Sequence, residues 1–427
     1  PKWLKDAAGK LREIPPFPNG SAPWPSTNWN VNPGATNAVT LADYRHLYKL
    51  YLSDPHLQNA RARWPFISTW DDHEFTNDAW QSHDTYLDGP GKPAQTRKVV
   101  ANKAWFEFIP AALSDAGSPK GVPNPAYDFR GVSVSDSPYT SGGFGQDEAI
   151  DPNPDNLTAL NSMRIYRALR WGKRLEIFLT DNRTFKSPPP ETPKDKDGKR
   201  PPLPPVEWVN ILDAGRTANG GKPPATMPGS ETRNPRASLP PGSVLGREQK
   251  TWFKAALKAS DATWKVWANS FPALPIRLDL NNVPFAGMAK SCLGVDGWNG
   301  YPGERRELLD FIREQKIANV VSCAGDHHAH FAGRLVPDLD DPSSNAVALE
   351  FACAGISSEP LFPGVQRAAA SNAVFAAMGS FQRGGETVLN WHRTMLGGAY
   401  SALMTAMTGS DAIGDMYWKP GASPGLD

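Results

Sequence analysis

Hydrophobic and polar positions alternate along the chain with two different periods. Apolar residues at helical spacing predict helices over residues 41–51, 55–63, 97–109, 247–260 and 302–315. Continuous apolar runs typical of buried strands predict strands over residues 66–69, 264–270, 317–324 and 347–353. Two further runs, 165–171 and 175–180, flank Gly172-Lys173 and indicate an antiparallel hairpin. Helices that alternate with strands in this way are typical of an α/β fold.

Three segments do not follow this alternation. Residues 1–40 are rich in Pro, Asn, Gly and Trp and show no sustained period, so we expect an irregular entry segment. Residues 187–242 are Pro-rich and charged, which predicts a surface insertion with polyproline-like stretches. Residues 364–427 are rich in Ala and Met and predict a helical tail. We therefore expect residues 1–427 to form one domain that carries these three additions.

The composition argues against several classes of protein. A chain of 427 residues with a formal net charge of +1 has no bulk charge that would attract nucleic acid as a stable partner or an anionic membrane. No apolar stretch approaches the roughly 18 residues that a membrane-spanning helix needs. The three cysteines do not make a disulfide framework. The sequence therefore predicts a soluble protein with a large buried core.

Two short blocks concentrate polar side chains directly after apolar runs. Trp70-Asp71-Asp72-His73-Glu74 follows the predicted strand at 66–69, and Gly325-Asp326-His327-His328-Ala329-His330 follows the one at 317–324. The blocks hold four of the eight histidines in the chain. Because open α/β proteins assemble their sites at the carboxyl edge of the sheet, both blocks are candidate site segments.

The residue types in these blocks are those that hold metal ions in hydrolases. Asp72 and Asp326 offer carboxylates and His328 an imidazole, a set that suits one or two divalent or trivalent cations. Such ions polarise a phosphoryl oxygen and lower the pKa of a bound water. His73 could instead protonate a leaving oxygen or hold transition-state charge. A helix cap beside a surface histidine is the usual interpretation of one Asp-His pair, but two strand-end clusters favour the metal site.

Other strand ends add candidate substrate contacts. Arg183 follows a predicted strand, and its guanidinium has the fork suited to bidentate phosphate binding. Since alternate residues face opposite ways, His330 is expected on the same side as Asp326, while His327 points elsewhere. Asn269 ends another predicted strand and is a further candidate behind or beside the substrate.

The block Trp70-Asp71-Asp72-His73-Glu74 resembles the signature of the PhoD-like alkaline phosphatase/phosphodiesterase family of the calcineurin-like metallophosphoesterases. Four other stretches resemble the family in the same order, and the resemblance spans about residues 41–355. They are Leu41-Ala42-Asp43-Tyr44-Arg45 with Ser53-Asp54-Pro55-His56-Leu57-Gln58, then Leu179-Thr180-Asp181-Asn182-Arg183, then Leu245-Gly246-Arg247-Glu248-Gln249 through Trp264-Lys265-Val266, and Gly300-Tyr301-Pro302-Gly303-Glu304-Arg305 leading to Gly325-Asp326-His327-His328.

This resemblance implies a four-layer α/β/β/α sandwich that hydrolyses phosphomonoesters or phosphodiesters, small-molecule substrates, by metal-activated water. It assigns Asp72, Asp326 and His328 to metal-binding positions. We add Asp71, which precedes Asp72, as a further candidate ligand. It places His73 beside the phosphoryl group and Arg183 in contact with the substrate phosphate. It also implies two or more metal ions, iron with calcium or else zinc or manganese, and an exported, periplasmic or secreted, protein.

The chain departs from the family pattern at both ends. A Gly-Asp-x-x-Tyr type motif, an upstream cysteine and a C-terminal Gly-His-Gly-Tyr-like strand do not occur in it. We therefore expect N-terminal strands to be missing from this chain, and an N-terminal fragment of the same protein to complete the sheet. Two alternatives stay open: a catalytically dead relative that serves as a binding or scaffold module, and a metallohydrolase of non-phosphate esters, against which Arg183 argues.

Overall fold

The computed structural model describes most of the chain between Thr36 and Gly355. The described residues are 17, 22–23, 36–85, 92–114, 117–138, 140, 150–198, 201, 203–278, 290–355, 380–383 and 386–389. They belong to two units. Unit 1 comprises residues 1–188 and 243–262, and unit 2 comprises residues 189–242 and 263–427.

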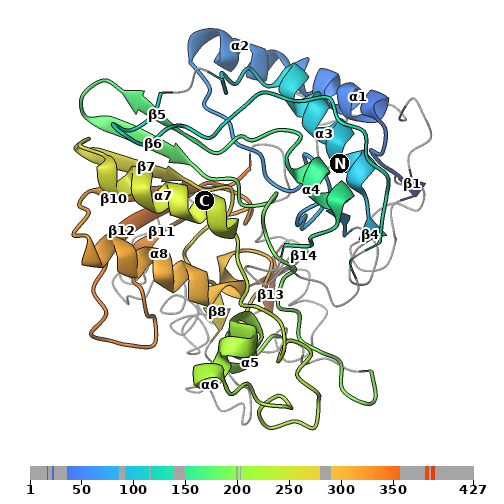
Figure 1. The fold of residues 1–427 in the computed structure, drawn as a ribbon, viewed down its shortest axis with the longest axis vertical. Coiled ribbons are helices and arrows are strands. Elements are labelled where there is room, and N and C mark those ends of the chain that lie inside the picture. The colour runs from blue at the N-terminus through green and yellow to red at the C-terminus, as the bar shows by residue number, and fades with distance from the viewer. Residues whose placement is uncertain are drawn as a thin grey trace. The chain divides into compact units, whose positions relative to one another are not determined.

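Unit 1 is built mainly from helices. They are α1 (Leu41–Leu52), α2 (Pro55–Arg63), α3 (Gln95–Phe108), α4 (Pro154–Leu160) and α7 (Gly246–Ala259), drawn in Figure 1. Local capping explains where the first two begin. Thr40 and Asp43 form a capping box, in which the Thr40 hydroxyl accepts from the Asp43 N–H at 3.3 Å and the Asp43 carboxylate accepts from the Thr40 N–H at 3.0 Å. Asp54 caps α2, whose first residue is a proline.

The strands of unit 1 are few. β5 (Arg167–Trp171) and β6 (Leu175–Leu179) form the predicted antiparallel hairpin. The short pairs are β1 (Ala22–Pro23) with β2 (Thr36–Asn37), and β3 (His83–Asp84) with β4 (Lys92–Pro93). The strand predicted over 66–69 is wrong, because residues 65–71 have no assigned strand among the described residues. An apolar run forms a strand only where a neighbour takes up its backbone N–H and C=O groups, and Phe66 and Ile67 are instead 46% and 43% exposed.

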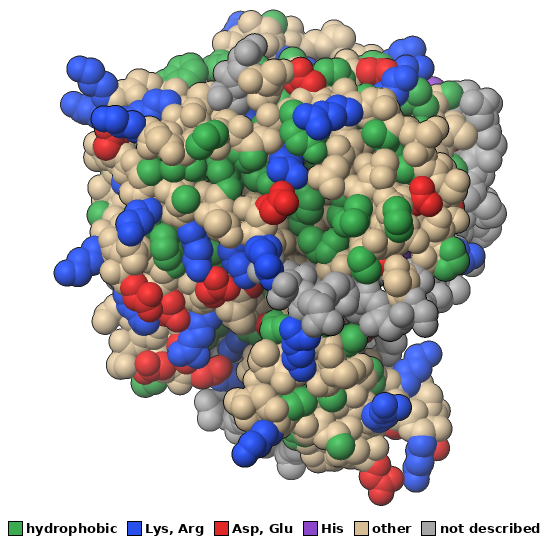
Figure 2. All heavy atoms as spheres, viewed as in Figure 1, with side chains coloured by type: hydrophobic (Ala, Val, Ile, Leu, Met, Phe, Trp, Pro, Cys, Tyr) green, Lys and Arg blue, Asp and Glu red, His purple; other side chains and the backbone are tan. Residues whose placement is uncertain are grey.

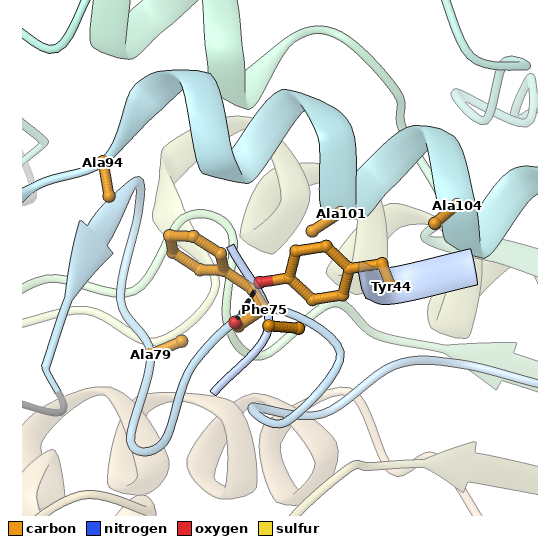
Figure 3. Close-up of a cluster of buried hydrophobic side chains, with 7 residues drawn as sticks. Tyr44, Phe75, Ala79, Ala94, Ala101 and Ala104 are labelled. Carbon is orange, nitrogen blue, oxygen red and sulfur yellow. Dashed lines mark hydrogen bonds between the residues drawn. The ribbon is translucent and has the colours of Figure 1, made fainter. Parts of the chain in front are cut away.

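A small core in unit 1 holds the loop that follows Asp72. Tyr44 of α1 points at the backbone of Phe75 beneath α3, and Ala101 and Ala104 of that helix pack around them (Figure 3). The Tyr44 hydroxyl donates to the Phe75 carbonyl oxygen at 2.6 Å. Burial of the apolar side chains and this hydrogen bond together fix the loop to two helices.

Unit 2 contains a mixed sheet. β7 (Trp264–Ala268), β10 (Val320–Ala324) and β12 (Ala348–Ala352) are parallel, and β11 (Phe331–Leu335) pairs with β12 in the antiparallel sense. Three of these strands, β7, β10 and β12, were predicted to within three residues at each end. β11 was not, because Gly333 and Arg334 interrupt its apolar pattern. Helix α8 (Pro302–Glu314) follows the predicted range and buries Leu308, Leu309 and Ile312.

The Pro-rich segment contains regular structure of its own. It holds α5 (Val206–Ala214), the 3-10 turn η1 (Gly215–Thr217) and the short α6 (Ala218–Gly221). A buried cluster forms around them from Trp208, Ile211, Leu212, Ala218 and Met227. Gly215 has φ +54°, and a Cβ there would lie 2.4 Å from the Leu239 carbonyl oxygen, so this turn requires glycine. The segment therefore packs more extensively than its high proline content predicts.

The remaining short elements of unit 2 lie at its loops. β8 (Arg277–Leu278) pairs with β9 (Ser291–Cys292), η2 spans Trp298–Gly300, and β13 (Ser380–Arg383) pairs with β14 (Glu386–Leu389). The rest of the predicted helical tail lies outside the described residues. Within the described part of the chain, no helix has the length and apolarity needed to cross a membrane. On the face that Figure 2 shows, Lys and Arg side chains are interspersed with Asp and Glu, in keeping with the small net charge.

Candidate functional site

The candidate residues divide between the two units. Those of unit 1 are Asp71, Asp72, His73 and Arg183, and those of unit 2 are Asn269, Asp326, His328 and His330.

Asp72 is a buried carboxylate held by its own loop. Its Oδ1 accepts from the His73 N–H at 2.8 Å, its Oδ2 accepts from the Asp78 N–H at 2.9 Å, and Asp78 reaches this position with φ +52°. Burial by itself would raise the pKa of Asp72. The charges of His73 and Arg183 and the two N–H donors outweigh burial and lower the pKa to about 2. The carboxylate is therefore ionised at neutral pH, and its oxygens retain lone pairs for a further ligand.

His73 lies at the surface next to this carboxylate. Its side chain is 59% exposed, and its Nε2 lies 3.9 Å from Oδ2 of Asp72. The first sequence block thus provides a buried acceptor, Asp72, next to an accessible imidazole, His73. Such an imidazole can exchange a proton with a bound molecule.

Arg183 is bound to Asp71, the other carboxylate of the block. Its Nε donates to Oδ1 of Asp71 at 2.7 Å, and the Arg183 and Asp71 side chains are 1% and 24% exposed. The contact orients the guanidinium plane and occupies one of the two Asp71 oxygens. Because Arg183 is so deeply buried, a phosphate would reach it only where a terminal nitrogen becomes accessible.

Asp181 organises the backbone around this pair. A single oxygen, Oδ1, accepts from the Trp70 indole at 2.8 Å, from the Arg183 N–H at 3.1 Å and from the Thr184 N–H at 2.9 Å. The strand end at Arg183 and the tryptophan before Asp71 are therefore tied to one carboxylate. Lys98 approaches from α3, with its amine 4.8 Å from the centre of the Trp70 ring. Burial lowers the pKa of Lys98 to about 8, although Asp181 and Glu74 act in the opposite direction.

In unit 2 the second block has a contorted backbone. Asp326 and His328 both lie in the left-handed region, with φ of +66° and +54°. Residues other than glycine adopt this conformation uncommonly, although Asp and His do so more often than most, and such departures gather at functional sites. They also break the strand-like alternation assumed for this block, so His327 does not point away from Asp326. Its Nε2 lies 3.6 Å from Oδ2 of Asp326. His328 and His330 are exposed.

Asn269 lies at the carboxyl end of β7, beside the strand that leads to Asp326. Its N–H donates to the Cys323 carbonyl oxygen at 2.9 Å, and the Gly325 N–H donates to the Ser270 carbonyl oxygen at 3.0 Å. The side chain is buried, with 5% exposed. Parallel strands thus bring Asn269 and the Gly325–Asp326 turn to one edge of the sheet.

The donor types present fit a cation. In unit 1, Asp72 is an ionised carboxylate. In unit 2, Asp326 is half-buried in a turn with positive φ, and His328 presents an exposed imidazole. Carboxylate oxygens with an imidazole nitrogen suit zinc, iron or manganese, and carboxylates suit calcium. Two buried charged residues that the sequence did not single out are Lys98 and Glu350. Their only signal was a charge inside an otherwise apolar or helical run.

Comparison with known proteins gives consistent matches. A family model described as PhoD-like phosphatase matches residues 19–393. The chain is 25% identical over 323 residues to alkaline phosphatase D of Bacillus subtilis (strain 168), across 75% of this chain and 40% of that protein. A solved structure titled "Structure of PhoD" is similar with a TM-score of 0.50 at 23% identity, across 79% of this chain and 49% of that one, and this likeness bears on the fold alone. The chain thus spans less than half the length of these relatives.

Proposed function

The chain belongs to the PhoD-like phosphatase family, and on that basis we propose that it hydrolyses phosphate esters with the help of bound metal ions. The observation that carries the proposal is the pairing of an ionised, buried Asp72 with an exposed His73 next to it. A carboxylate that can bind a cation and an accessible imidazole that can give up a proton are two groups that metal-assisted hydrolysis of phosphate esters uses.

We assign the metal ligands by unit. Asp72 is the ligand in unit 1, with Asp71 contributing through the oxygen that Arg183 does not occupy. Asp326 and His328 are the ligands in unit 2. When bound, two or more ions would supply an activated water and neutralise charge on the phosphoryl oxygens. We propose iron with calcium from the resemblance to the family, and zinc or manganese would also suit these donors.

The other residues act on the substrate. His73 gives a proton to the leaving oxygen, which its exposure permits. Arg183 holds Asp71 in place and supplies positive charge where the phosphate binds. Asn269 and His330 are proposed to contact the ester or the water around it. We propose phosphomonoesters or phosphodiesters as the substrates. We also propose that the protein is exported to the periplasm or the medium.

We also propose the four-layer α/β/β/α sandwich of the metallophosphoesterases, with an N-terminal segment of the same protein completing it. The support is an uncovered apolar face on β12, where Leu349 and Phe351 are 47% and 52% exposed. Apolar side chains in a row on a strand are normally covered. Intact mass of the native protein tests the idea, because a co-purifying segment adds to the mass of residues 1–427 and a lone, folded, metal-loaded chain contradicts it.

Activity on two chromogenic esters tests the function. The purified, metal-loaded protein is expected to release p-nitrophenol from p-nitrophenyl phosphate, bis(p-nitrophenyl) phosphate or both. Asp72→Asn is expected to lower the activity at least about 100-fold, since it removes the ionised ligand. Asp341→Asn, a change at an exposed aspartate of unit 2, is the control and should leave activity unchanged. A folded, metal-loaded protein that cleaves neither ester contradicts the proposal and favours a binding module.

A further inference from the structure

Besides Asp326, unit 2 has a fully buried carboxylate on one strand of its sheet. Glu350, in the middle of β12, is 0% exposed. Its Oε1 accepts from the Ala273 N–H at 2.9 Å and from the Ser322 hydroxyl at 2.7 Å, and its Oε2 accepts from the Leu274 N–H at 2.6 Å. Burying a carboxylate is costly unless donors compensate for lost water. Glu350 therefore joins the loop after β7 to strands β10 and β12.

The hydrogen bonds of Glu350 have a fixed direction. Burial raises the pKa of Glu350 above its usual value, although the N–H groups of Ala273 and Leu274 and the hydroxyl of Ser322 act in the opposite direction. A carboxylate with three donors around it acts as an acceptor, so the Ser322 hydroxyl donates its hydrogen bond to Glu350. Ser322 Oγ can then only accept from its other neighbour, the Asn269 side chain at 2.9 Å.

This direction determines which end of the Asn269 amide faces Ser322. Only the NH2 group can donate, so Nδ2 must face Ser322 and Oδ1 must face the opposite way. The three side chains are 5%, 0% and 0% exposed, and water does not compete for these bonds. Asn269 is also fixed by its backbone beside Cys323, three residues before Asp326.

We propose that Glu350, acting through Ser322, is a positioning residue that makes Asn269 present its carbonyl oxygen, not its NH2 group, at the carboxyl edge of the sheet. The inference rests on the proposed function for its role in catalysis. An amide oxygen attracts electropositive groups, namely a cation or the proton of a water or hydroxyl group, and repels phosphate oxygens. Asn269 therefore does not bind the phosphate of the ester.

Ser322→Ala removes the link while leaving both N–H bonds to Glu350 in place. We expect about a tenfold loss of kcat/KM, and a similar loss for Asn269→Ala. The double variant should lose no more than the larger single effect, because both changes break one chain of bonds. Glu350→Gln keeps the shape but can donate to Ser322, which reverses the chain, so it should match Ser322→Ala. Ser344→Ala, which removes another serine hydroxyl of unit 2, is the control.

Two readouts separate positioning from simple destabilisation. Additive losses in the double variant, or an equal loss in Ser344→Ala, overturn the proposal. Titration with Mn²⁺ or Ca²⁺ distinguishes the ligand: weaker cation binding in Ser322→Ala identifies a cation near Oδ1, and unchanged cation binding with a lower kcat identifies a water or hydroxyl donor.

The orientation can also be tested without any activity. In NMR spectra of the full chain, the side-chain NH2 protons of Asn269, assigned by their loss in Asn269→Ala, should exchange slowly with solvent. They should exchange at least about tenfold faster in Ser322→Ala and Glu350→Gln. Equal exchange in all three proteins overturns the positioning even if the enzyme is active. Slow exchange in a protein that cleaves neither ester retains the positioning and refutes only the proposed function.

Discussion

The guanidinium Nε of Arg183 donates to Oδ1 of Asp71 across 2.7 Å, from a side chain that is 1% exposed. The two residues are 112 positions apart in the sequence. The same arginine lowers the pKa of the neighbouring Asp72. One buried cation therefore holds one carboxylate in place and keeps a second one ionised.

Arg183→Lys tests this arrangement, because lysine keeps the charge and loses the planar fork. We expect kcat/KM for p-nitrophenyl phosphate to fall about 100-fold, a size typical of losing one aligned donor at a developing charge. Arg170→Lys is the matched control, since Arg170 pairs with Asp261 in the same unit. If both lysine variants keep wild-type kinetics, the role given to Arg183 is wrong.

Tyr44→Phe tests the support of the loop after Asp72. The hydroxyl donates to the Phe75 carbonyl oxygen and accepts from Nε of Arg97 at 2.8 Å, so its removal leaves two buried groups without this partner. We expect the free energy of unfolding to fall by about 1–3 kcal/mol. Urea unfolding measures the change, and Tyr51→Phe on the same helix should change stability by much less. A loss of equal size in the two variants would refute a specific role for the Tyr44 hydroxyl.

Because His83 is buried, we expect the folded protein to lose stability in acid. Burial lowers its pKa from 6.5 to about 3, and its ring stacks on Trp80. Below pH 6.5 the unfolded chain takes up a proton that the folded chain does not, so stability falls between pH 6.5 and about 3. We expect the contribution to reach a few kcal/mol at the acid end of that range.

The matched pair for this prediction is His83→Gln and His56→Gln, the second at an exposed position of α2. Urea unfolding at pH 4 and pH 7 should show a smaller pH difference for His83→Gln than for wild type. His56→Gln should keep the wild-type difference. Identical pH differences in all three proteins would contradict a neutral, buried His83.

Removing the metal ions with a chelator should lower both the metal content and the thermal stability of the protein. We expect about two metal ions per chain in the native protein, a lower melting temperature after chelation, and recovery on adding the metal back. Elemental analysis identifies the metals. Asp326→Asn and His328→Gln should each lower the metal content, whereas Asp341→Asn should not. Full metal content in both variants would remove these residues from the ligand set.

Periodicity along the chain predicted most of the longer elements. Helices α1, α7 and α8 and strands β7, β10 and β12 lie close to their expected ranges, because an amphipathic period records which face is buried. The polar blocks that follow apolar runs also singled out Asp72, His73 and Asp326 as candidates, since residue type and position after an apolar run are local properties.

The tertiary structure decided what those residues contact. Asp181 collects donors from Trp70, Arg183 and Thr184, and Glu350 reaches Asn269 through Ser322; no local pattern specifies such partners, because they come from segments far apart in sequence. His327 faces Asp326 only because two residues adopt positive φ, and residues 66–69 form no strand because a strand depends on its neighbour. The sequence by itself determined which residue types stand at the ends of the strands, since periodicity and composition are local. Hydrogen-bond direction, burial and backbone strain depend on the folded surroundings, and only the tertiary structure decided them.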